Sequence, residues 1–316
     1  EETSQAEIGK DILIFEQAQR LSIMVTTDSV CDLPEPLKKE FGISVCPYYV
    51  CTDQGRFMDE LELKADELLV HIAGGKHGVS EPPNVEDYER FFAERLTEAQ
   101  NVIHITMAKH VSQGYQNAVE AAKSFENVTV VDSGHVSSSM GLAVLYAAYM
   151  AENHATKGEI IDNVKRLRRY ISSAFIIDST HMMCRTGRIP KRVQILCDAL
   201  LLHPVMRLRN SRMVVGGLEM GSFRHVTKGY IRKTLSDTRS IDRRILFITY
   251  AGMDERSLQY IQELVQQHCP FERVYLQKAS SAISSNCGPG SFGLLFMRKN
   301  EVEIEFSKAS DWETTN

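Results

Sequence analysis

Three short segments combine hydroxyl, carboxylate and glycine residues in patterns typical of loops that bind anions. They are Thr27-Asp28-Ser29, Val131-Asp132-Ser133 and Asn286-Cys287-Gly288-Pro289-Gly290. The first two follow apolar runs that predict β-strands. A helix that starts after such a turn leaves several backbone N–H groups unpaired, and these groups favour a carboxylate or a phosphate. We therefore expect one polar pocket if the fold brings the three segments together.

Composition and charge limit the partners that this chain can have. Its 316 residues are 43% hydrophobic and 24% charged, which suffices for a large core and predicts two compact domains. The formal net charge of −5 disfavours general nucleic-acid binding, which needs a basic surface. No apolar run approaches the roughly 18 residues of a membrane span, and no signal-peptide pattern opens the chain. We expect a cytoplasmic protein without stable membrane insertion.

The cysteines favour a reducing compartment, because the seven form no CxxC pair and are odd in number. His181, Cys184, Cys197 and His203 resemble the ligand set of a zinc site. Cys197 lies within an apolar helical pattern, however, and core packing explains it better than metal binding. We therefore expect no metal site and no cofactor.

Alternating strands and helices predict a parallel sheet in the amino-terminal half. Predicted strands cover 22–27, 43–51, 102–107 and 128–131, and predicted helices cover 33–41, 65–73, 84–95, 112–125 and 139–153. Elements that alternate in this way form βαβ crossovers. Ligands of such sheets bind at the carboxyl ends of the strands, where the hydroxyl-rich turns fall.

The pattern changes beyond residue 157 and predicts a second domain of the α+β class. Predicted strands cover 174–177, 245–250, 273–277, 292–298 and 301–306, with a hairpin near 207–215 and helices at 157–169, 193–200 and from 227. The last two strands would pair as an antiparallel hairpin. We assign 22–172 to a parallel-sheet α/β domain and 173–316 to an α+β domain with a mixed or antiparallel sheet. Residues 1–21 are interpreted as a linker helix from their apolar spacing.

The order of the short motifs resembles that of the DegV family, over roughly Ser22 to Lys299. Thr27 to Leu33 is similar to the TDSxxDL motif that opens the family, and Ser112 to Ala118 is similar to its SGTYQSA segment. Gly187-Arg188-Ile189 matches a GGRI segment, and Gly288 begins a GPGxxG segment. Each motif is weak alone, whereas their shared order and spacing are specific. The resemblance implies a parallel-sheet domain of the EDD type followed by an α+β domain.

The same resemblance implies a protein that binds a long-chain fatty acid as the acyl-carrier subunit of a bacterial fatty acid kinase. In the family the acyl tail lies in an apolar tunnel between domain layers, and hydroxyl groups with a histidine bind the carboxylate. Here Val79 and Asn286 stand where the family has threonine and histidine, and Ala108 and Lys109 stand where it has two serines. We expect Lys109 to compensate with a charge-assisted hydrogen bond, and Asn286 to keep one donor.

The residues expected to bind the ligand lie in the hydroxyl-rich segments and at the altered positions. They are Thr27, Asp28, Ser29, Ser80, Lys109, Ser112, Asp132, Ser133, Asn286 and Gly288. The tunnel is expected to be lined by Phe175, Ile176, Met182, Met183, Leu200 and Leu201. A basic cluster is expected to dock an acidic kinase partner, and it consists of Arg185, Arg188, Lys191 and Arg192.

Simpler interpretations stand beside these assignments. Helix capping alone explains Ser or Asp after a strand, an isolated lysine is most often solvated, and Asn286 suits a turn. A hydrolase that uses Ser112 or Cys287 is one rival function, although the sequence shows no activating group beside either residue. A sensory lipid-binding module that signals to an upstream domain through residues 6–20 is another. We expect a binding protein without enzymatic activity of its own.

Overall fold

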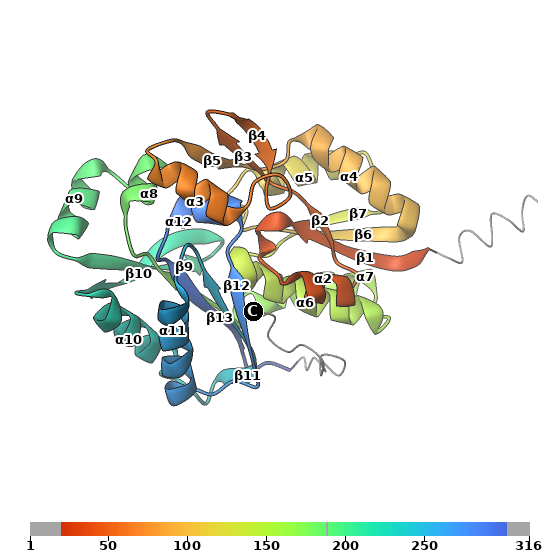
Figure 1. Cartoon of the computed structure of the whole chain (residues 1–316). Coiled ribbons are helices and arrows are strands. Elements are labelled where there is room, and N and C mark those ends of the chain that lie inside the picture. The colour runs from red at the N-terminus through yellow and green to blue at the C-terminus, as the bar shows by residue number, and fades with distance from the viewer. Residues whose placement is uncertain (1–19, 188, 302–316) are drawn as a thin grey trace, which may run out of the picture.

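Three β-sheets organise the computed structural model, which describes residues 20–187 and 189–301 (Figure 1). The first sheet has four parallel strands in the order β2-β1-β6-β7. The strands are β1 Leu21–Asp28, β2 Ser44–Cys46, β6 Ala99–Thr106 and β7 Val128–Asp132. The parallel sheet predicted for the amino-terminal half is therefore confirmed.

Helices cover both faces of the parallel sheet, as βαβ crossovers require. On one face, Tyr88 and Phe92 pack against Val102, and on the other, Leu145 belongs to the apolar cluster that contains Ile103. The helices around this sheet are α2 Glu35–Glu40, α4 Val85–Glu98, α5 Gly114–Ala122, α6 Ser137–Glu152 and α7 Lys157–Leu167.

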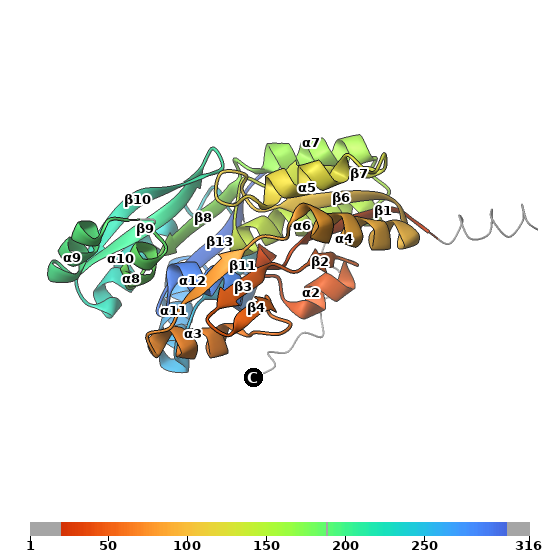
Figure 2. The same cartoon turned by 90° about the horizontal axis from the view of Figure 1, so that it is seen from above.

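The second sheet has six strands in the order β10-β9-β8-β13-β11-β12. Neighbouring strands are antiparallel except β11 and β12, which confirms the predicted mixed sheet. The strands are β8 Ile171–Ile176, β9 Leu202–Arg209, β10 Arg212–Met220, β11 Ile241–Tyr250, β12 Arg273–Lys278 and β13 Phe292–Arg298. The helices are α8 His181–Arg185, α9 Lys191–Ala199, α10 Phe223–Thr234, α11 Glu255–His268 and α12 Ser281–Cys287. Both views place α8, α9 and α10 at the end away from the parallel sheet (Figures 1 and 2).

A small antiparallel sheet, β4-β3-β5, forms the third layer. Its strands are β3 Tyr49–Thr52, β4 Gly55–Met58 and β5 Gly78–Glu81, and α3 Ala65–Ala73 lies between the last two in sequence. The sequence predicts one strand over 43–51 and no strand between 52 and 101. The structure instead ends β2 before Pro47, whose nitrogen has no hydrogen to donate to a ladder. It also places Ser80 in β5, opposite Val50.

Helix α6 joins the two larger sheets. Its residues from Ser137 to Ala148 are all buried, because β1 lies on one side of the helix and β8, β11 and β13 lie on the other. An added Cβ at Gly141 would lie 2.6 Å from the carbonyl oxygen of Cys31. Glycine therefore allows the turn after β1 to pack directly on the helix.

Some predicted boundaries fall at the limits of the described residues. The predicted linker helix falls almost entirely on residues 1–19, and the predicted strand at 301–306 falls almost entirely on residues 302–316. Both of these segments lie outside the described residues. The predicted domain boundary at 172/173 lies inside β8. No helix in the described ranges is both long enough and apolar enough to cross a membrane.

Candidate functional site

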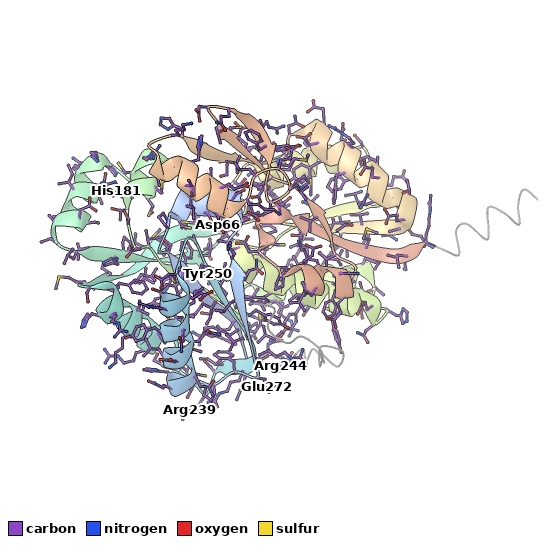
Figure 3. The ribbon with its side chains drawn as sticks, in the orientation of Figure 1. Asp66, His181, Arg239, Arg244, Tyr250 and Glu272 are labelled. Carbon is purple, nitrogen blue, oxygen red and sulfur yellow. The ribbon has the colours of Figure 1, made fainter. Side chains whose placement is uncertain are left out.

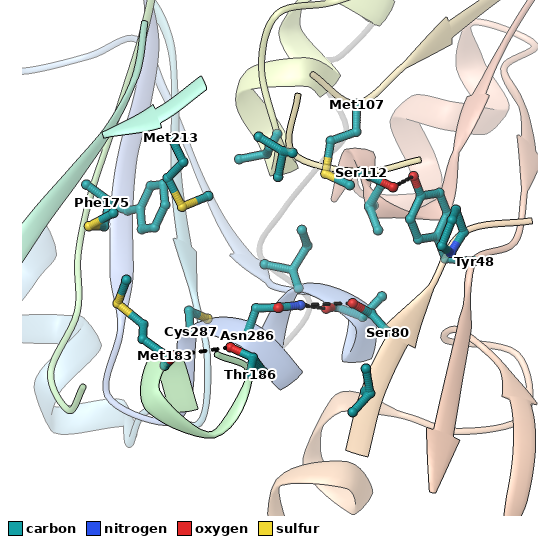
Figure 4. Close-up of a pocket in the computed structure, with 18 of the residues that line it drawn as sticks. Tyr48, Ser80, Met107, Ser112, Phe175, Met183, Thr186, Met213, Asn286 and Cys287 are labelled. Carbon is teal, nitrogen blue, oxygen red and sulfur yellow. Dashed lines mark hydrogen bonds between the residues drawn. The ribbon is translucent and has the colours of Figure 1, made fainter. Parts of the chain in front are cut away.

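A cavity of about 570 Å³ lies where the three sheets approach one another (Figure 4). This volume is typical of a small-molecule site. One side of the cavity carries the polar groups of Tyr48, Ser80, Ser112 and Asn286. Most of the remaining wall is apolar and includes Val136, Phe175, Ile177, Met183, Met206 and Met213. The cavity therefore suits an elongated apolar ligand with one polar end.

Two hydrogen-bonded pairs order the polar side of the cavity (Figure 4). Asn286 Nδ2 donates to Ser80 Oγ at 2.9 Å. Ser112 Oγ lies 2.9 Å from Tyr48 Oη and accepts from the N–H of Gly114 at 3.1 Å. Burial raises the pKa of Tyr48 well above its ordinary value, so its hydroxyl stays protonated and can donate. Ser80 and Ser112 can then direct their own hydroxyl hydrogens toward a ligand.

The opening Thr-Asp-Ser segment holds this polar side in place from outside the cavity. Ser29 Oγ accepts from the N–H of Tyr48 at 3.0 Å and donates to Asp59 at 2.5 Å. An added Cβ at Gly114 would collide with the hydroxyl of Tyr48, so glycine is needed for the contact between Tyr48 and Ser112. Ser29 is therefore a positioning residue and does not line the cavity.

Helix α12 carries Asn286 into the cavity, and three carboxylates fix the start of this helix. Asp32 accepts from the N–H of Ser280 at 2.9 Å, and Asp59 accepts from the N–H of Ala282 at 2.9 Å. Glu60 accepts from the N–H of the intervening residue at 2.8 Å. The position of the cavity wall thus depends on carboxylates that lie far away in the sequence.

The carboxyl end of α12 explains the glycine-rich segment. Gly288 follows the helix with φ +75°, a backbone conformation that glycine adopts without strain. An added Cβ there would lie 2.8 Å from Cγ of Met182. Asn286 lies in the last turn of a helix, where the N–H groups are already bonded. This segment is therefore not the anion-binding helix start that its sequence suggests.

Strand alternation decides which of the predicted tunnel residues face the cavity. Phe175 and Ile177 line it, whereas Ile176 points to the opposite side of β8 and joins another apolar cluster. Met183 lines the cavity, while Met182 is buried in the core beside α12. Leu200 and Leu201 are also absent from the wall, since they follow α9 and are 50% and 60% exposed.

Four other predicted ligand residues are engaged in contacts away from the cavity. Thr27 Oγ1 donates to the carbonyl oxygen of Ile105, and Asp28 accepts from Tyr88 Oη at 2.8 Å and contacts His104 Nε2 at 3.2 Å. Asp132 accepts from Ser211 Oγ at 2.8 Å, and Ser133 bonds to the backbone of His135. The three hydroxyl-rich segments therefore do not converge on one pocket.

Lys109 also lies outside the wall of the cavity. Its backbone N–H donates to Asp132 at 3.2 Å, and its carbonyl oxygen accepts from Gln116. Within the described ranges, the cation that lines the cavity is Arg185 of α8. Its Nη2 donates to the carbonyl oxygen of Lys76 at 2.5 Å, which ties α8 to the end of α3. The cation at the cavity wall is therefore Arg185 and not Lys109.

The basic cluster expected to dock a partner is divided by the structure. Arg185 is exposed but also borders the cavity, whereas Lys191 and Arg192 are exposed at the start of α9. Arg188 lies outside the described residues. Histidine and cysteine positions nearby do not form a metal site: within the described ranges, no group of three or more His, Cys, Asp or Glu is placed to hold an ion. His181 instead contacts Asp198 at 3.2 Å on the surface of α8 (Figure 3).

Comparison with known proteins identifies the family. A family model described as "Uncharacterised protein, DegV family" matches residues 22–299. The chain therefore belongs to the DegV family. A DegV domain-containing protein of Caldanaerobacter subterraneus is 26% identical over 281 residues, which are 88% of this chain and 99% of that protein.

Solved structures of the family share this fold. A DegV family protein from Thermus thermophilus, described as fatty-acid binding, is 27% identical with a TM-score of 0.76, and the match covers 88% of this chain and all of that one. A DegV family protein from Eubacterium eligens, loaded with heptadecanoic acid, is 18% identical with a TM-score of 0.75 over 88% of this chain. Structural neighbours of this chain thus bind fatty acids.

Proposed function

We propose that this protein binds a long-chain fatty acid in the cavity between its sheets, with the carboxylate at Ser80, Ser112 and Asn286. The observation that carries the proposal is the division of the cavity into a polar side and an apolar wall. A fatty acid has the same division. The fatty-acid binding described for the Thermus thermophilus relative supports this choice among apolar ligands.

Hydroxyl donors suit a carboxylate, because an ionised carboxylate only accepts hydrogen bonds. Asn286 contributes indirectly, since its amide donates to Ser80 and to the carbonyl oxygen of Ala282. Ser80 accepts from Asn286, and Ser112 accepts from Gly114, so the hydroxyl hydrogen of each serine is available to the ligand. Hydrogen bonds to a charged acceptor contribute roughly 1.5–3 kcal/mol each. Arg185 adds a positive charge at the cavity wall, although its exposure to solvent weakens the effect.

We further propose that the protein presents the bound acid to a partner kinase in the cytoplasm. Arg185 at the cavity wall, and Lys191 and Arg192 at the start of α9, are exposed and would attract an acidic partner surface. Phosphoryl transfer would then belong to the partner. Ser112 contacts Tyr48 and Gly114, and neither group is a base that would activate its hydroxyl for catalysis.

Replacing the polar side chains is expected to weaken acid binding without unfolding the protein. Ser112→Ala removes a hydroxyl donor, and Asn286→Leu removes the amide that donates to Ser80 and orients its hydroxyl. We therefore expect each variant to bind palmitate about 10- to 100-fold more weakly. The measurement is a titration of delipidated protein with palmitate, followed by displacement of a fluorescent fatty acid. Ser124→Ala, an exposed serine that contacts Glu89, is the control and should bind as tightly as the unaltered chain. Delipidated, folded protein that takes up neither palmitate nor oleate would overturn the proposal.

A further inference from the structure

A second, smaller chamber of about 50 Å³ adjoins the main cavity. Four residues border both spaces: Val136, Phe175, Ile283 and Cys287. The chamber lies between the start of α6 and the six-stranded sheet, and its inner wall includes Ser173, Thr249, Phe292 and Leu295. These four shared side chains therefore separate the main cavity from a space deeper in the protein.

Phe175 is the largest of the four shared side chains. It lies on β8, and Figure 4 shows its ring beside Met213, on the side of the cavity away from Tyr48 and Ser112. Its neighbour on β13 is Gly293, which has no side chain to hold the ring from that strand. The ring is therefore at the end of the cavity opposite the polar groups, and one adjacent strand leaves it room to turn.

The smaller chamber can accept hydrocarbon, because the serine and threonine hydroxyl groups at its wall already have partners. Ser173 Oγ lies 2.9 Å from Ser139 Oγ, and Thr249 Oγ1 lies 2.7 Å from Ser138 Oγ. Ser291 Oγ donates to the carbonyl oxygen of Cys287 at 2.9 Å. A methyl end that entered the chamber would therefore not deprive these hydroxyl groups of hydrogen bonds.

We propose that Phe175 sets the longest acyl chain that the protein holds in full. This inference rests on the proposed binding of a fatty acid with its carboxylate at Ser80, Ser112 and Asn286. The acyl tail then runs toward Phe175, whose ring ends the main cavity. Longer tails reach the smaller chamber only when that ring is displaced. Affinity therefore rises with each added methylene until the tail meets the ring, and rises no further beyond that length.

The test compares two truncations at the apolar end of the cavity. Phe175→Ala opens the wall between the spaces, whereas Met213→Ala truncates a side chain that lines only the main cavity. Saturated acids from myristate to lignocerate are titrated into each delipidated variant. Each methylene accommodated strengthens binding roughly fourfold, so the plateau of Phe175→Ala should move to longer acids, each of which binds more tightly than the one before. Met213→Ala should weaken binding of every acid and keep the original plateau.

Phe175→Leu is a second variant in case Phe175→Ala does not stay folded, because leucine also suits a half-buried strand position. An unchanged plateau in both Phe175 variants, with the protein folded and acids bound, would overturn this inference alone. A shift of equal size in Met213→Ala would also overturn it, since truncation anywhere in the wall would then suffice. Failure of the unaltered protein to bind any acid would instead overturn the proposed function itself.

Discussion

Asp59→Ala is expected to lower the free energy of unfolding by roughly 4 kcal/mol, because it removes a buried carboxylate that accepts three hydrogen bonds. Ser29 and Ser281 each donate to it through a side chain at 2.5 Å, and Ala282 donates through its backbone. The loss would also release the start of α12 and shift Asn286 at the other end of that helix. Urea denaturation and palmitate titration of the same sample measure both effects.

Asp66→Ala is the matched control for this variant. Asp66 lies on the surface of α3, and its side chain is 62% exposed where it pairs with Lys278 (Figure 3). An exposed pair of this kind contributes less than about 1 kcal/mol, and palmitate binding should be unchanged. Equal stability losses in the two variants would contradict the role assigned to the carboxylates at the start of α12. So would an Asp59→Ala protein that binds palmitate as tightly as the unaltered chain.

Asp32→Asn is expected to stabilise the protein at neutral and alkaline pH. Burial raises the pKa of Asp32 to about 7, and the hydrogen bonds from Ser137 and Ser280 only partly offset that effect. The folded state therefore binds more protons than the unfolded state between pH 3.8 and about 7, and the free energy of unfolding falls as pH rises through this range. The ionised carboxylate then costs roughly 4 kcal/mol above about pH 8.

Asparagine is a suitable replacement at position 32. The residue has φ +44°, which asparagine tolerates, and its amide can meet both Ser137 and the N–H of Ser280. Denaturation of both proteins over the pH range gives the difference between them, in which all other groups cancel. We expect a difference near zero at about pH 4 that grows to roughly 4 kcal/mol at about pH 8. A difference that does not change with pH would contradict a raised pKa for Asp32.

His135 should act in the opposite direction and becomes visible in the same experiment. Burial lowers the pKa of His135 to about 4, so the unfolded state binds more protons between about pH 4 and 6.5. The free energy of unfolding therefore rises with pH in that window. In the unaltered chain this rise offsets the fall that Asp32 causes, and Asp32→Asn should expose it. The stability of Asp32→Asn should thus increase from about pH 4 to about pH 6.5.

Elements with a regular apolar spacing could be predicted from the sequence. The predicted helix over 65–73 has the same bounds as α3, because Leu68, Leu69 and Ile72 repeat on one face and glycines follow. Helix α12 gave no such signal, since its serine-rich sequence has weak helix propensity. Hydrogen bonds to Asp32, Asp59 and Glu60 fix the position of its start, and more than 220 residues separate each from its partner. Local sequence does not contain that contribution.

The candidate site was predictable only in part. Ser80, Ser112 and Asn286, which the sequence predicts as ligand residues, line the cavity. Lys109 matched a family position, but the turn that contains it bonds to Asp132 and leaves the cavity wall to other residues. Motif alignment gives the position of a residue along the chain and not the direction of its side chain.

Tyr48 and Arg185 line the cavity, but the sequence predicted neither of them as a ligand residue. Tyr48 stands in an aromatic strand segment, and only its contact with Ser112 reveals that its hydroxyl faces the cavity. Arg185 was grouped with surface cations, because the sequence does not show that α8 lies against the end of α3. Both assignments depend on contacts between segments far apart in the chain, which strand and helix patterns do not predict.

The orientation of the bound acid is the central claim, and one crystal structure tests it most directly. The ligand is palmitate with a bromine atom on its terminal carbon, whose anomalous signal locates the tail. We predict the bromine beside Phe175 and the carboxylate within hydrogen-bonding distance of Ser80 and Ser112. A bromine beside Tyr48, or a carboxylate bound by Lys109 outside this cavity, would contradict the account.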